Sequence, residues 1–244
     1  MNEQTIRGGQ AGRGTETISG PRALITISRQ HGARGAVIAK LVAERLGFAC
    51  WDRELVGAIA AQLRVAPATM IRFDEHRRCS GDDTEPGRTS TLSDPGHADY
   101  VRGLKLVARS LAKRGAAVVV GRGLAFVLDP AECLRVRVVC PLEDRIAGLV
   151  ERANLAPETA RATIDYVDRE RQAFIRELYD RDIEDPAGYD LQVSTGAMSV
   201  DTAVDVIVAA YRSRFDARPW PKATTPAPFA RREHRPTMPV SRNR

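Results

Sequence analysis

Cysteine is scarce in this sequence, which has four among its 244 residues. No two of the four have the close spacing of zinc ligands, and they are too few and too scattered for a disulfide framework. Cys50, Cys133 and Cys140 lie in or beside apolar runs. We therefore interpret these three as small core residues and expect no zinc site.

Long apolar runs are missing as well. No stretch approaches the roughly 20 apolar residues that a membrane helix needs. Residues 1–21 are polar and glycine-rich, without the apolar core of a signal peptide. We expect these residues to form a flexible leader, and we expect a cytoplasmic protein that has no membrane partner.

Acidic residues are fewer than basic ones: 31 Asp and Glu oppose 37 Lys and Arg, which gives a formal net charge of +6. The whole excess lies after residue 216, where seven basic residues oppose Glu233, so residues 1–216 sum to zero. Residues 217–244 also hold six of the fourteen prolines, and their only aromatics are Trp220 and Phe229. We predict a disordered basic tail there, and the neutral body argues against a nucleic-acid partner.

Short apolar runs alternate with helical patterns across residues 22–216, which we predict to be one domain. Strands are predicted at 23–28, 48–51, 116–120, 134–140 and 189–194. Helices are predicted at 36–46, 53–63, 67–77, 100–114, 142–152, 157–182 and 200–214. This alternation is typical of an α/β fold in which a five-stranded parallel sheet has helices on both faces. The segment at about 77–98 is rich in Gly, Ser, Thr, Asp and Pro, and we predict a mobile insertion.

The turn after the first predicted strand carries the strongest functional signal, because it joins the strand directly to a helix. Gly32 and Gly35 allow a tight turn that exposes N–H groups, and the N-terminus of a helix attracts anions. Arg29 and Arg34 add positive charge. The turn is thus a predicted phosphate cradle, and the alternative is a plain strand-to-helix turn with solvated arginines. The predicted cofactor-binding residues are Ser28, Arg29, Gly32, Ala33, Gly35 and Ala36.

This turn departs from the standard nucleotide loop, G-x-x-x-x-G-K-[ST]. Aligned on the following helix, Arg29 and Arg34 replace the two glycines, and Gly35 replaces the lysine. Arg34 could supply the lost charge from a neighbouring position. Ala36 stands in place of the Ser or Thr, and nothing obvious replaces the hydroxyl that normally holds Mg²⁺.

Other charged residues are predicted to meet this turn, because ligands of parallel sheets bind at the carboxyl ends of the strands. Arg122 directly follows the continuous apolar run 116–120, and Asp52 follows the second predicted strand. A guanidinium pairs well with phosphate oxygens, so Arg122 is a candidate phosphate ligand or, alternatively, a salt bridge at the sheet edge. Asp52 is a candidate substrate ligand or a helix cap.

The predicted helix 157–182 is densely charged and contains Asp168, Arg169 and Arg171. Arg169 and Arg171 are candidates for holding nucleotide phosphates, and the alternative for all three residues is a solvated helix stabilised by opposite charges three or four residues apart. On the preceding helix, Arg145 could pair with a carboxylate or reach a phosphate. His31, in the turn, is interpreted as a solvated loop histidine, and the alternative is a donor to a bound anion.

Four segments of the chain, in the same order and spacing, resemble the cytidylate kinase-like family, which is related to cytidylate kinase. The resemblance covers residues from about 23 to 210 and includes the aromatic-Asp pair Trp51-Asp52. The four segments are ITISRQHGARGAVIAKLVAERLGFACWDRELV, RGAAVVVGRGLAFVLDP, VRVVCPLEDRIAGLVER and DYVDRERQAFIRELYDRDIEDPAGYDLQVST.

The resemblance implies the P-loop fold of nucleoside monophosphate kinases, with a helical lid, a substrate-side insertion, and the use of ATP and Mg²⁺. It implies a nucleoside monophosphate acceptor, CMP, dCMP or a related compound. Gly121-Arg122 matches the Gly-Arg that holds the acceptor's phosphate, and Asp168 and Arg171 match the Asp-x-x-Arg of the lid. The alternative function is a non-catalytic nucleotide or phosphate sensor on the same fold.

The predicted roles divide accordingly. Arg34, Arg169 and Arg171 are the predicted catalytic residues. Arg34 would cradle the donor phosphates, Arg171 would hold the acceptor, and Arg169 would stabilise the transferred group. The predicted substrate-binding residues are Asp52, Gly121, Arg122, Asp168 and Arg171.

Overall fold

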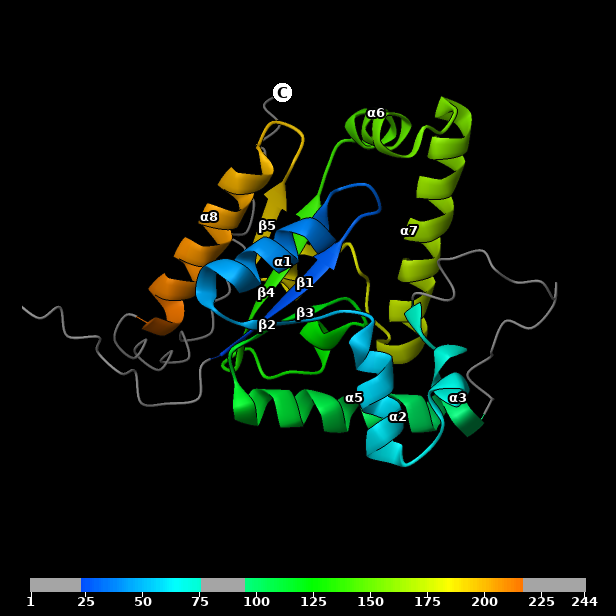
Figure 1. The fold of residues 1–244 in the computed structure, drawn as a ribbon, viewed down its shortest axis with the longest axis vertical. Helices are drawn as coiled ribbons and strands as arrows, with labels where there is room; N and C mark the ends of the chain where they lie inside the picture. Colours follow the sequence, from blue (N-terminus) through cyan, green and yellow to red (C-terminus); the bar gives the residue numbers. More distant parts are fainter. Residues whose placement is uncertain (1–22, 76–94, 217–244) are drawn as a thin grey trace, which may run out of the picture.

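The computed structural model describes residues 23–75 and 95–216 (Figure 1). The predicted leader, the predicted tail, Cys79 and most of the predicted insertion lie outside the described residues. Among the described residues, no helix combines the length and apolarity needed to cross a lipid bilayer.

Five parallel strands form one sheet in the order β2-β3-β1-β4-β5. The central strand β1 pairs Ile25 with Val118 of β3 and with Leu134 of β4. The strands are β1 (Leu24–Arg29), β2 (Ala49–Trp51), β3 (Ala117–Val120), β4 (Cys133–Val139) and β5 (Leu191–Ser194). This pairing confirms the predicted five-stranded parallel sheet. Parallel neighbours need a crossover connection, which the helices between the strands supply.

Helices cover both faces of the sheet (Figure 1). Alternate strand residues point to opposite faces, so Leu24 belongs to one apolar core and Ile25 to the other. The core around Ile25 is closed by α1 (Gly35–Leu46) and α8 (Val200–Tyr211). The core around Leu24 is closed by α2 (Glu54–Leu63), α5 (Pro95–Arg114) and α7 (Pro157–Tyr179). The remaining elements are α3 (Pro67–Ile71), η1 (Leu124–Phe126), α6 (Leu142–Ala153), η2 (Pro186–Gly188) and η3 (Arg212–Asp216).

Two predicted boundaries on the α2–α5 side are wrong. The helix predicted at 67–77 ends at Ile71, because the chain turns after it and buries the ring of Phe73 at 2% exposure. The helix predicted from residue 100 begins at Pro95, so residues 95–98 are helical and do not belong to a mobile loop. Proline suits a first helical turn, since its φ is fixed and its missing N–H would have no partner there.

Two later helices also end before their predicted limits. α7 ends at Tyr179, because Asp180 adopts a left-handed φ of 50°. α8 ends at Tyr211 and continues as a π-helical turn, η3.

The contact between α2 and α5 supports a stability prediction at Gly103. A methyl group there would lie 2.7 Å from Cγ2 of Ile59 and 2.8 Å from Cδ1 of Leu63. We expect Gly103→Ala to lower the free energy of unfolding by about 1–2 kcal/mol, because overpacking outweighs the gain in helix propensity. Urea unfolding followed by circular dichroism measures the change.

The matched control is Gly57→Ala on the exposed side of α2, where a methyl group would meet nothing within 4 Å. This variant should be more stable than the wild type by up to about 1 kcal/mol, through helix propensity alone. Equal stability changes in the two variants would contradict the close approach of α2 and α5 at Gly103.

Candidate functional site

The candidate site lies at the edge of the sheet where β1, β2 and β3 end. Parallel strands bring their carboxyl ends to one edge, which places the turns after these three strands together. The N–H of Gly121, after β3, donates to the carbonyl of Ile27 in β1 at 3.0 Å. Asp52, after β2, accepts from Nη1 of Arg122 at 2.7 Å.

The turn after β1 depends on two residues with left-handed φ angles, Gly32 at 82° and Arg34 at 62°. Arg34 directly precedes α1, and its side chain is exposed. Gly35 is buried, and it has no room for a side chain, because a methyl group there would lie 2.4 Å from Cβ of Arg29. Ala33 is buried as well, whereas Ala36 is exposed on the first turn of α1. Phosphate binding by this turn stays a prediction.

An open cavity of about 300 Å³ adjoins this turn. It lies between the turn, α6 and the segment that joins β5 to α8. Arg34 and Arg152 line it, together with the acidic Asp144 and Glu151. Of the residues predicted to bind the donor's phosphates, Gly32 and Arg34 face this cavity.

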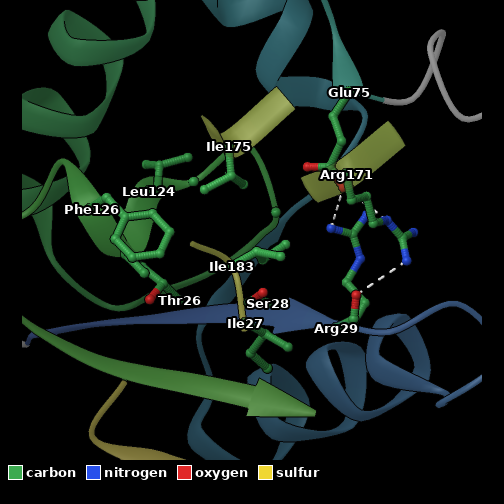
Figure 2. Close-up of a pocket in the computed structure, with 13 residues that line it drawn as sticks. Thr26, Ile27, Ser28, Arg29, Glu75, Leu124, Phe126, Arg171, Ile175 and Ile183 are labelled. Atoms are coloured by element: carbon green, nitrogen blue, oxygen red, sulfur yellow. Dashed lines mark hydrogen bonds and ion pairs between the residues drawn. The ribbon is translucent and has the colours of Figure 1, made fainter. Parts of the chain in front are cut away.

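Ser28 and Arg29, which are also predicted to bind the cofactor, line a second, enclosed pocket (Figure 2). Arg29 is 7% exposed, and its Nη1 donates to Oε1 of Glu75 at 2.6 Å. The hydroxyl of Ser28 accepts from Nη1 of Arg137 at 2.9 Å and from the hydroxyl of Tyr189 at 3.2 Å. Arg29 therefore does not add a solvent-facing charge to the turn.

Glu75 lines one side of the enclosed pocket, and Figure 2 shows the side chains of Arg29 and Arg171 directed toward it. Its Oε1 accepts from Arg29 and, at 3.2 Å, from Nε of Arg171. Its Oε2 accepts the backbone N–H of Arg122 at 2.5 Å. Burial opposes the ionisation of Glu75, but the three arginines outweigh it and hold the pKa of this carboxyl well below its usual range.

Arg122 is fully buried and adopts a left-handed φ of 52°. Its Nε and Nη2 donate to the two carboxylate oxygens of Asp74 at 3.0 and 3.1 Å. Its Nη1 is shared between Asp52 and the carbonyl of Val120. Burial alone would lower the pKa of this guanidinium, yet Asp74 and Glu75 hold it above its usual value. The predicted phosphate ligand is thus already bound by two carboxylates, so its role toward a substrate stays a prediction.

Asp168 brings α7 against the turn after β1. Its Oδ1 accepts the N–H of His31 at 2.7 Å, and its Oδ2 accepts from Nη1 of Arg145 at 2.5 Å. Nη1 of Arg171 lies 3.8 Å from Oδ1 of Asp168 and donates to the carbonyl of Arg29 at 3.2 Å. The predicted lid residues Asp168 and Arg171 are therefore next to the predicted phosphate turn.

Two further candidate residues lie near this contact, Arg169 and His31. Arg169, the third candidate on α7, is exposed. His31 is half-buried, and burial lowers the pKa of its imidazole, which favours the neutral ring.

The buried and half-buried charged side chains at this edge of the sheet form a cluster in which the formal charges cancel. Four arginines meet four carboxylates, and each carboxylate lies within 3.2 Å of an arginine nitrogen. The arginines are Arg29, Arg122, Arg145 and Arg171, and the carboxylates are Asp52, Asp74, Glu75 and Asp168.

Sequence reasoning missed Asp74 and Glu75, because both fell inside the predicted helix 67–77 and looked like ordinary helical acids. The available signal was indirect: arginines placed at a buried sheet edge need carboxylate partners. Among the described residues, no group of three or more His, Cys, Asp or Glu side chains is arranged to hold a metal ion.

Two solved structures resemble this one. An uncharacterized protein from Eubacterium ventriosum matches with a TM-score of 0.59 and 20% identity, over 79% of this chain and all of that chain, which shows a shared fold. A shikimate kinase from Acinetobacter baumannii, in complex with shikimate, matches with a TM-score of 0.42 and 14% identity over 79% of this chain and 94% of that one.

Among curated proteins, a uronate isomerase from Corynebacterium glutamicum is 26% identical over 140 residues. The match covers 52% of this chain and 27% of that protein, so the chain spans about a quarter of its curated relative's length.

A family model gives the most extensive sequence match. The model described as the cytidylate kinase-like family matches residues 24–197, from the start of β1 to beyond β5. This range includes the turn after β1 and all eight charged residues of the cluster. The chain therefore belongs to the cytidylate kinase-like family.

Proposed function

We propose that the protein is an ATP-dependent phosphotransferase of the nucleoside monophosphate kinase type, with CMP, dCMP or a related monophosphate as acceptor. In this reaction the bond between the γ-phosphorus of ATP and the oxygen of ADP breaks. A new bond forms to an oxygen of the acceptor's phosphate, and the products are ADP and a nucleoside diphosphate. The choice of a cytidine acceptor is supported by family membership alone.

One observation carries this proposal: the end of β1 and the turn that follows it contribute to both cavities. Gly32 and Arg34 of the turn line the open cavity, whereas Ser28 and Arg29 at the end of β1 line the enclosed pocket. Phosphoryl transfer requires that two phosphate groups approach each other in line, with cations near the transferred group. The phosphates of a donor in the open cavity and the phosphate of an acceptor directed at the enclosed pocket would approach each other there.

The residues of the open cavity fit the phosphates of ATP. The N-terminus of α1 presents unpaired N–H groups, and Arg34 and Arg152 supply charge. Mg²⁺ would neutralise charge on the transferred group. In kinases this ion is bound largely by nucleotide phosphates and water, with only one or two carboxylates, so the lack of a three-ligand group among the described residues is compatible with it.

A second candidate function is a non-catalytic nucleotide or phosphate sensor. Two observations favour it: the turn lacks the lysine and hydroxyl of the standard loop, and the arginines of the enclosed pocket are already paired with carboxylates. Losing a cation that acts only in the transition state typically costs several kcal/mol of activation free energy.

Turnover separates the two functions. We expect purified protein with ATP and Mg²⁺ to form ADP in the presence of CMP or dCMP, as followed by a coupled assay. The control is the same reaction without an acceptor, which measures ATP hydrolysis alone. ATP binding without turnover on any monophosphate would rule out the kinase and favour the sensor.

The donor cavity is tested at Arg34. We expect Arg34→Ala to weaken ATP binding by at least about tenfold, because charge-assisted hydrogen bonds to phosphate contribute roughly 1.5–3 kcal/mol. Isothermal titration calorimetry measures the affinity.

The matched control is Arg45→Ala, which removes an arginine from the last turn of the same helix, where it pairs with Asp205 on the surface. ATP affinity should be unchanged in this control. If Arg34→Ala also retains wild-type affinity, the donor's phosphates do not bind at the turn.

A further inference from the structure

Glu75 is held in the way that a bound anion would be held. It is 3% exposed, and two guanidinium groups from different elements converge on it, Arg29 from β1 and Arg171 from α7 (Figure 2). The third donor is a backbone N–H, that of Arg122 at 2.5 Å. Guanidinium groups and backbone N–H groups are the donors that proteins use for phosphate.

The backbone that supplies the N–H has an unusual conformation. Gly121, Arg122 and Gly123 all have positive φ angles, of 73°, 52° and 66°. Within this turn the N–H of Arg122 donates to Glu75, whereas the N–H of Gly121 donates to the carbonyl of Ile27. Gly121 cannot carry a side chain, because a methyl group would lie 2.2 Å from Nη1 of Arg29 and 2.4 Å from Oε2 of Glu75.

The enclosed pocket also contains a small void. This cavity of about 20 Å³ is lined by Arg29, Glu75 and Arg171 and also by apolar residues, among them Leu124, Phe126 and Ile175. This volume is enough for about one water molecule. A phosphate group is larger than a carboxylate, and the void supplies part of the extra room once the side chain of Glu75 moves away.

We propose that Glu75 is a tethered occupant of an oxyanion site formed by Arg29, Arg171 and the N–H of Arg122, and that a phosphate group competes with it. The ligand is either inorganic phosphate or the phosphate of the acceptor, and the second case rests on the proposed function. A group attached to the chain has a high effective concentration at its own site. Free phosphate therefore binds the native protein weakly, and a ligand that makes further contacts is favoured.

The first test removes the tethered carboxylate with Glu75→Ala. We expect its melting temperature to fall by about 10 °C, because the buried arginines lose their shared partner. Inorganic phosphate should then raise the melting temperature by several degrees more than sodium chloride at equal ionic strength. The wild type should show a much smaller phosphate-specific rise.

A second variant covers the case in which the alanine variant does not fold. Glu75→Gln keeps the size of the side chain and removes its charge, so it should bind inorganic phosphate at least about tenfold more tightly than the wild type in calorimetry. The matched control is Glu143→Gln. Glu143 also pairs with an arginine, Arg161 at 2.6 Å, but its side chain is 77% exposed, and phosphate affinity should not change.

CMP and cytidine distinguish the two sources of phosphate. If CMP stabilises Glu75→Gln more than cytidine or inorganic phosphate does, the site takes the acceptor's phosphate; if inorganic phosphate stabilises it as well as CMP does, the site takes the free ion. The proposal is overturned if phosphate stabilises the wild type and the Glu75 variants equally, or stabilises none of them beyond sodium chloride. None of these measurements needs phosphoryl transfer, so inactivity as a kinase does not affect them.

Discussion

The pairing of buried arginines with buried carboxylates determines the arrangement of the functional edge of this protein. A charge removed from water is strongly destabilising unless an opposite charge and hydrogen bonds replace its hydration. Arg122 meets this requirement with Asp52 after β2 and Asp74 after α3. Glu75 then links Arg29 of β1 to Arg171 of α7. Each ion pair therefore holds one element against another, and losing one partner leaves the others uncompensated.

The same pairing weakens the attraction of the site for an anionic ligand. Four arginines at one edge would attract anions strongly, but four carboxylates cancel their formal charge. A phosphate that reaches the enclosed pocket must therefore exchange with a carboxylate and cannot simply add to free cations. Such an exchange favours ligands that gain contacts elsewhere, which is a requirement for selectivity. The excess of +6 in the chain comes from residues 217–244 and not from the residues of this cluster.

The fold could be predicted from the sequence because its signals are local. The continuous apolar run of β3 indicates a strand buried on both faces, and Gly47 and Gly115 mark the ends of α1 and α5. The partners of the arginines could not be predicted in this way. Asp74 and Glu75 pair with residues 46 or more positions away, and no local pattern distinguishes them from solvated helical acids. The burial of the Arg29 side chain could not be predicted for the same reason, since its partner Glu75 is also distant in the sequence.

The two cavities offer their cations under different physical conditions. Arg34 is exposed, so water screens its charge and its side chain must be ordered by the ligand. Arg29 and Arg171 are buried and held by Glu75 in a region of lower effective dielectric, where a charge interacts more strongly. A phosphate that displaces Glu75 would meet both guanidinium groups there, and strong local charge of this kind stabilises a transition state. Under the proposed function, the enclosed arginines would therefore contribute more to the transfer step, and Arg34 more to donor binding.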